Sequence, residues 1–297
     1  MDITDSIVSF RRHLKRKNFS RYTVRDYMNT LKTFGLWLDV PLEEVDHRKM
    51  VQFIDWLLDK NLSPKTINCY LESIRSLYRF LQEEGMEVVC PVKTGDALRL
   101  SKPLPRFLKD EEVELFFSKV FKKRDRAIFY LMLRCGLRVE EVAHLKLDAL
   151  DLRRGRILVA AGKGAKDRMV YISPDAHRVL TDYLSQRASS KEHALFLVEK
   201  GTCKGKPLSV RGIQKRMEYY AKKAGLKASC HQLRHTMATQ LLNADADITV
   251  IQDLLGHNRI GTTQRYCRVS NPKVQRDYQR AIEVVMKRTL PPESASS

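Results

Sequence analysis

Residues 231–266, HQLRHTMATQLLNADADITVIQDLLGHNRIGTTQRY, are the most informative stretch of the chain. Its apolar residues recur at helical spacing, which predicts two consecutive amphipathic helices. Four residues of the stretch are candidate catalytic residues. They are the His-x-x-Arg pair His231 and Arg234, then His257 at the end of a Leu-Gly-His motif, and then Tyr266. A histidine, an arginine, a second histidine and a tyrosine in this order indicate a site that acts on a phosphodiester.

Arginine side chains are the first requirement of such a site. Displacement at phosphorus develops negative charge on the oxygens around it, so a protein must supply fixed positive donors. A guanidinium donates two parallel hydrogen bonds and stays charged at any working pH. The candidates are Arg138, in the segment Gly-Leu-Arg, and Arg234. Either arginine alone could be an ordinary surface residue in a chain with 54 lysines and arginines, but the motif context favours the catalytic interpretation.

A tyrosine nucleophile needs help, because its ordinary pKa near 10 makes the phenolate rare at pH 7, a cost of roughly 4 kcal/mol. His231 could accept the phenol proton or bind the phosphate, and His257 could donate to a phosphate oxygen. Both could instead be structural, or His231 and His235 could be a metal pair. The segment HQLRH lacks the glutamate of H-E-x-x-H and no third ligand is evident, so we expect no metal and no cofactor. Tyr266 is preferred by context over Tyr278, its nearest rival.

A lysine on a hairpin could complete the site. Residues 156–160 and 168–172 are β-prone and flank a Gly-Lys-Gly turn, which predicts a hairpin with Lys163 at its tip. A lysine there could donate the proton that the leaving 5′ oxygen requires. Lys166 is close enough to be a rival, and such a turn could also merely contact phosphate.

The N-terminal part, residues 4–85, is predicted to form four amphipathic helices. Ser20, Asp46 and Ser63 can cap the second, third and fourth helices, and Gly85 ends the fourth. Basic residues cluster near the first two helices, and as a group they favour phosphate contact, although any one could be a solvated surface residue. The predicted DNA-binding residues are Arg11, Arg12, Lys15, Arg16, Lys17, Arg21 and Arg25.

Composition indicates a polyanionic partner. The 297 residues include 54 Lys and Arg against 35 Asp and Glu, a net charge of +19 that exceeds what solubility needs and suits double-stranded DNA. The six cysteines include no C-x-x-C pair, which argues against a zinc ribbon or a disulfide framework. No secretory signal or membrane-spanning run is evident, so we expect a cytosolic protein, in a prokaryotic cytosol, without membrane contact.

Breaks in the helical pattern divide the chain. Prolines and glycines interrupt regular structure after the fourth helix, and a second, mainly helical part with a small antiparallel sheet follows. A final amphipathic segment, 272–286, needs an apolar groove. The expected parts are an N-terminal helical DNA-binding domain at 1–87, a linker at 88–106, a catalytic domain at 107–271, and a C-terminal helix with a disordered tail at 272–297.

Five segments, CGLRVEEVAHL, AGKGAKDRMVYI, HQLRHTMAT, IQDLLGH and TTQRY, resemble in order and spacing the motifs of the tyrosine recombinase (phage integrase type) family. The resemblance implies strand cleavage through a 3′-phosphotyrosyl bond with a free 5′ hydroxyl, without ATP or metal. Glu141 in the first segment is interpreted as structural. Met237 and Cys267 depart modestly from the family pattern. The implied catalytic set is Arg138, Lys163, His231, Arg234, His257 and the nucleophile Tyr266.

The resemblance also implies an assembly on DNA. Family members form a C-shaped clamp from a helical and a catalytic domain, and four subunits act pairwise through a Holliday junction. The terminal helix would dock on a neighbouring subunit, and a partner recombinase or an accessory DNA-binding protein could take part. The chain is similar to the simple Xer, integron or transposon members. Two alternatives stay open: a relaxing enzyme like type IB topoisomerases, and an architectural DNA-binding protein with a vestigial site.

Overall fold

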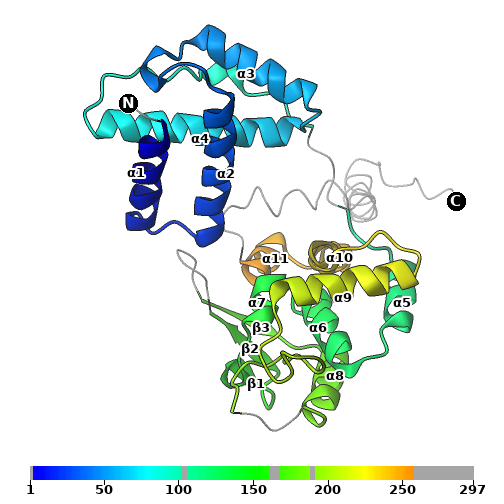
Figure 1. Cartoon of the computed structure of the whole chain (residues 1–297). Coiled ribbons are helices and arrows are strands. Elements are labelled where there is room, and N and C mark those ends of the chain that lie inside the picture. Colours follow the sequence, from blue (N-terminus) through cyan, green and yellow to red (C-terminus); the bar gives the residue numbers. More distant parts are fainter. Residues whose placement is uncertain (1–2, 102–105, 161–166, 188–190, 257–297) are drawn as a thin grey trace, which may run out of the picture. The chain divides into compact units, whose positions relative to one another are not determined.

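A computed structural model describes residues 3–101, 106–160, 167–187 and 191–256, in two compact units that divide between residues 102 and 103 (Figure 1). The predictions for Lys163, His257, Tyr266 and the terminal segment 272–297 fall outside the described residues.

The first unit contains the four expected helices: α1 Ile3–Arg16, α2 Arg21–Trp37, α3 His47–Asp59 and α4 Pro64–Glu83, with short 3-10 turns η1 Leu42–Glu44 and η2 Thr94–Asp96. The side chains of Ser20, Asp46 and Ser63 each accept a hydrogen bond from the backbone N–H three residues on, at 3.0, 2.8 and 3.2 Å. Gly85, with φ of 83°, follows α4 in the left-handed region. The predicted caps are therefore confirmed.

The core of this unit extends into the segment expected to be a linker. Val88 and Val92 are buried in the same apolar cluster as the residues of the four helices. The Asn68 side chain accepts from the N–H of Leu98 at 2.8 Å and donates to its carbonyl at 2.9 Å. Residues 88–98 of the expected linker 88–106 thus pack on the first unit.

The second unit is mainly helical with a small sheet, as predicted. Its helices are α5 Asp110–Lys119, α6 Lys123–Arg134, α7 Val139–Ala143, α8 Pro174–Leu184, α9 Val210–Lys223, α10 Cys230–Asn243 and α11 Ile248–Leu255, with a 3-10 turn, η3 Leu147–Ala149. Strands β1 Leu150–Asp151, β2 Arg156–Val159 and β3 Arg168–Tyr171 form an antiparallel sheet in the order β1-β2-β3. The predicted hairpin is β2–β3, with Val159 opposite Arg168.

Helix α6 is the centre of the second unit, packed against both α8 and α10. Its apolar run, 127–133, is buried except for Tyr130, which is partly exposed. A smaller cluster that includes Met237, Leu242, Ile251 and Leu255 joins α10 to α11. The cluster fixes the C-terminal end of α11 beside α10. None of the described helices is long and apolar enough to cross a membrane.

A buried charged network joins α6 to α9. Asp125 is fully buried, and one of its carboxylate oxygens accepts from Nε and Nη2 of Arg124 at 2.9 and 2.7 Å. The other accepts from Arg216 Nε at 2.7 Å and from the hydroxyl of Tyr220 at 3.1 Å. Burial, followed by the charge of Asp125, raises the pKa of Tyr220 to about 12. The network satisfies a charge that would otherwise be costly to bury.

Candidate active site

Helix α10 carries the first pair of predicted site residues. The Ser229 side chain caps the helix, and His231 and Arg234 follow on its first turns, three residues apart and so on one side. Arg234 is only 2% exposed, and its guanidinium donates to the carbonyl oxygens of Gly136 and Leu255. Arg234 therefore joins the loop before α7 to the end of α11.

Arg138 reaches the same end of α11 from another direction. It is the residue before α7, and its backbone N–H and Nη1 donate to the two oxygens of Glu141 at 2.7 and 2.8 Å. Its Nη2 donates to the carbonyl of Gly256 at 3.3 Å, while the side chain stays 40% exposed. Arg138 and Arg234 thus bind consecutive carbonyls, those of Gly256 and Leu255. Two predicted site residues 96 positions apart (234 − 138) converge on the residues that precede His257.

A glycine makes this convergence possible. Gly136 has φ of 64°, and a Cβ there would lie 3.0 Å from Cδ2 of Leu255 and 3.2 Å from Sδ of Met237. Only glycine combines this backbone conformation with so close an approach. The approach brings the Gly136 carbonyl within reach of Arg234.

Glu141 holds two arginines. Besides Arg138, the carboxylate accepts two parallel hydrogen bonds from Nη1 and Nη2 of Arg168, both at 2.8 Å. Burial alone would raise the pKa of Glu141, but the hydrogen bonds and charges of Arg168 and Arg138 outweigh it and hold that pKa at about 2. The sequence motifs indicate a structural role for Glu141 and indicate no role for Arg168. No local signal predicts their pairing, because the two residues are 27 positions apart.

His231 lies beside His235 in an open pocket. Its ring meets that of His235 edge to face, with centroids 4.1 Å apart. Both histidines line a cavity of about 450 Å³, together with Arg106 and Lys227. Although His231 is exposed to solvent at one side, partial desolvation and then the charges of Arg234 and Arg138 lower its pKa. A neutral imidazole can accept a proton.

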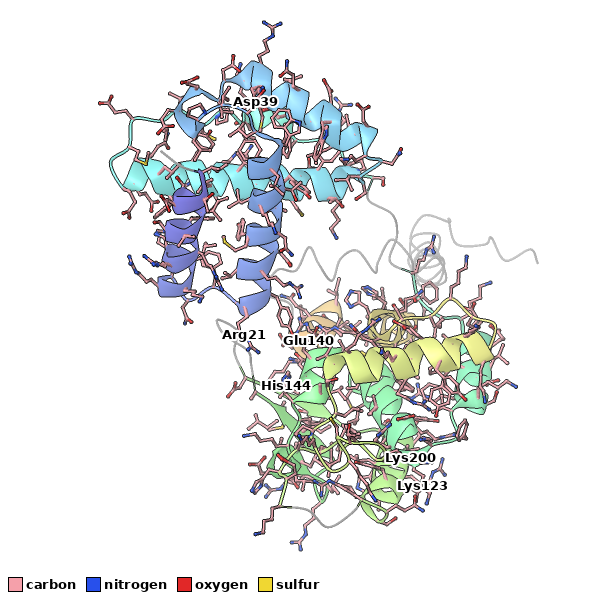
Figure 2. All side chains as sticks on the ribbon, viewed as in Figure 1. Arg21, Asp39, Lys123, Glu140, His144 and Lys200 are labelled. Atoms are coloured by element: carbon pink, nitrogen blue, oxygen red, sulfur yellow. The ribbon has the colours of Figure 1, made fainter. Side chains whose placement is uncertain are left out.

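The predicted DNA-binding residues occupy the C-terminal half of α1, the following loop and the first turns of α2, and all seven are exposed. Figure 2 shows Arg21 at the end of α2 that meets this loop. Lys17 pairs with Glu83 at 3.3 Å and Arg25 with Asp26 at 3.2 Å, but both pairs are solvent-exposed and therefore weak. Arg11, Lys15, Arg21 and Arg25 line a cavity of about 740 Å³ between the two helices.

Comparison with known proteins gives the family. Residues 106–272 match the Phage integrase family, and residues 7–85 match the Phage integrase, N-terminal SAM-like domain. The chain belongs to the phage integrase family. This tyrosine recombinase, an enzyme of site-specific DNA recombination, is 33% identical over 282 residues to tyrosine recombinase XerA of Thermococcus kodakarensis, covering 93% of this chain and 94% of XerA. It is 34% identical over 279 residues to tyrosine recombinase XerC of Thermodesulfovibrio yellowstonii, covering 89% and 91%.

Solved structures of recombinases share the fold. The recombinase is similar to the Tn1549 transposon integrase in complex with transposon right end DNA, with a TM-score of 0.78 at 19% identity over 95% of this chain and 100% of that chain. It is also similar to the XerH site-specific recombinase bound to a palindromic difH substrate, with a TM-score of 0.72 at 23% identity over 89% and 79%.

Proposed function

We propose that the enzyme cleaves and rejoins DNA strands through a 3′-phosphotyrosyl intermediate on Tyr266 and exchanges them through a Holliday junction, without ATP or a metal ion. The observation that carries the proposal is the convergence of Arg138 and Arg234 on the carbonyls of Leu255 and Gly256. Their two guanidinium groups concentrate positive charge at Leu255 and Gly256, the two residues that precede His257 in the sequence. Such a pair suits the nonbridging oxygens of one phosphodiester.

In the cleavage step the phenol oxygen of Tyr266 attacks phosphorus, forming a P–O bond to tyrosine as the bond to the 5′ oxygen breaks. The phenol proton passes to His231, whose lowered pKa keeps the imidazole neutral and able to accept it. Lys163 donates a proton to the departing 5′ oxygen. Arg138, Arg234 and His257 donate hydrogen bonds to the phosphate oxygens as their negative charge grows.

In the rejoining step a 5′ hydroxyl of the partner strand gives its proton to Lys163 and attacks phosphorus, and the bond to Tyr266 breaks as His231 returns a proton to the phenol oxygen. One phosphodiester bond is exchanged for another through a protein ester. No external energy source is therefore required.

We infer the assembly from the family resemblance and from the basic surface of the first unit. The cluster on α1 and α2 would contact phosphates from the domain at 1–87, and the catalytic domain at 107–271 would hold the opposite side of a C-shaped clamp on double-stranded DNA. Four subunits would act pairwise, with the C-terminal helix in 272–297 docked on a neighbour, together with any partner recombinase or accessory protein. We infer that the enzyme acts on DNA in the cytosol; its relatives XerA and XerC are tyrosine recombinases by name.

The test is covalent trapping on a nicked suicide duplex from the native target site. The wild-type chain should form a denaturant-stable protein–DNA complex, and Tyr266→Phe should abolish it while DNA binding survives. Tyr278→Phe is the matched control and should still trap DNA. Trapping by Tyr266→Phe would refute the nucleophile assignment, and relaxation of supercoils by wild type without any junction intermediate would favour a topoisomerase-like activity.

A further inference from the structure

We propose that Arg168 is a positioning residue of the reaction, which holds Glu141 so that this carboxylate orients Arg138 without cancelling its positive charge. The inference rests on the proposed function, because it takes Arg138 as a phosphate ligand. Arg168 is the first residue of β3 and is not among the six predicted catalytic residues.

The geometry at Glu141 is saturated. One carboxylate oxygen accepts from Nη1 of Arg138 and Nη1 of Arg168, both at 2.8 Å. The other accepts from the backbone N–H of Arg138 at 2.7 Å and from Nη2 of Arg168 at 2.8 Å. The paired bonds from Arg168 fix the plane of the carboxylate, which a single hydrogen bond would leave free to rotate. The plane of Glu141 in turn fixes the Arg138 guanidinium.

The charges give Arg168 a second effect. Two guanidinium groups share one carboxylate, so the cluster keeps a net charge of +1. The side chains of Arg168 and Glu141 are only 11% and 14% exposed, so solvent screens their interaction little. Without Arg168, the pair of Arg138 and Glu141 would be neutral and would attract a phosphodiester less strongly. Arg168 thus supplies charge as well as order.

A further hydrogen bond of Arg168 reaches the end of α11. Its Nε donates to the carbonyl of Leu254 at 2.9 Å. The next two carbonyls, of Leu255 and Gly256, accept from Arg234 and Arg138. Three arginines therefore bind three consecutive carbonyls at the negative end of the helix dipole.

Arg168, whose side chain is 11% exposed, is better placed to hold the helix end than Arg138, whose side chain is 40% exposed and can meet the substrate. It packs closely against Gly256, where an added Cβ would lie 3.0 Å from its Cδ. Arg168 also pairs with Val159 in the β2–β3 ladder, and Lys163 lies between these two residues in the sequence. One side chain thereby connects the segments that carry several predicted catalytic residues.

The experiment compares Arg168→Gln, Arg168→Lys and a charge-matched control, Arg154→Gln, which changes an exposed arginine in the β1–β2 turn. Single-turnover cleavage is measured on two nicked suicide duplexes. One has the normal scissile phosphodiester, and the other has a methylphosphonate there, which lacks the negative nonbridging charge that Arg138 would meet. DNA affinity and thermal melting are measured for every variant.

On the normal substrate we expect Arg168→Gln to slow cleavage by about 100-fold, the loss typical of a misplaced catalytic group. Arg168→Lys should lose less, because it keeps the charge but not the planar fork. On the methylphosphonate both defects should shrink to about tenfold or less, because stabilising negative charge matters less there. DNA affinity should change no more than in Arg154→Gln.

Two outcomes would overturn the proposal: wild-type cleavage rates in Arg168→Gln, or equal losses on both substrates, which would mean a general loss of structure. If Arg168→Gln does not fold, Arg168→Lys decides by the same comparison between substrates. Failure of the proposed function is distinguishable, since the wild-type chain would then form no covalent complex with the normal duplex.

Discussion

Replacing Asp125 by asparagine tests the energetic importance of the buried network between α6 and α9. The substitution keeps the side-chain shape but removes the charge. Arg124, whose side chain is 6% exposed, is then deprived of its hydrogen-bonded counterion within the protein. The new amide NH₂ would also face donors, since each carboxylate oxygen now accepts from at least two N–H or O–H groups.

The expected cost is large. Removing one partner of a buried ion pair destabilises a protein by about 3–5 kcal/mol. For a unit of this size each kcal/mol lowers the melting temperature by about 2–4 °C, so the second unit should melt roughly 6–20 °C lower. Glu218→Gln is the control, because its pair with Arg211 on the same helix is 61% and 65% exposed and should contribute about 1 kcal/mol or less.

The chain contains an internal reference for the assay. Its two tryptophans, Trp37 and Trp56, are partly buried against the core of the first unit, so their fluorescence in urea reports that unit. Far-ultraviolet circular dichroism reports both units. Asp125→Asn should shift the dichroism transition to lower urea and leave the tryptophan transition in place. A loss below about 1 kcal/mol, equal to that of Glu218→Gln, would refute the reasoning.

Three further predictions concern the site and the DNA surface. In an NMR titration the midpoint of His231 should lie below 6.5, the ordinary pKa of histidine, because its pKa is lowered. Arg138→Gln should move that midpoint upward, because it removes one of the positive charges that lower the pKa; an unmoved midpoint would contradict this. Gly136→Ala should cost more than about 1 kcal/mol in urea unfolding, because a left-handed residue with a side chain is strained and the Cβ would lie 3.0 Å from a leucine methyl. Replacing Arg21 and Arg25 with glutamine should reduce the slope of log K against log salt by about 0.9 for each phosphate that is no longer neutralised, measured by fluorescence anisotropy; an unchanged slope would mean that other residues bind the phosphates.

Local signals predicted much of this fold. Ser20, Asp46 and Ser63 each cap the helix that follows, as their side chains indicated. The β2–β3 hairpin follows from two β-prone runs around a glycine turn. Strand β1 was not predicted, because two residues, Leu150 and Asp151, carry no periodicity.

The hydrogen bonds that organise the candidate site were less accessible from sequence. The motifs pointed to Arg138 and Arg234, and the structure brings them to neighbouring carbonyls. Nothing local indicates that Arg168 binds Glu141, because many arginines compete for each carboxylate in so basic a chain. The burial of Asp125 was hidden for a similar reason, since its segment, KKRDR, has the composition of a solvated surface.

The bonds from Arg234 to the carbonyls of Gly136 and Leu255 have a consequence for mutagenesis of this enzyme. A side chain that ties two backbone segments together in the absence of DNA cannot be removed to measure chemistry alone. An inactive alanine variant at this position would combine a missing phosphate ligand with a loosened scaffold. Even citrulline, which replaces one terminal NH₂ of the guanidinium by oxygen, would lose the charge together with the hydrogen bond to one of the two carbonyls, so it would not separate these two contributions.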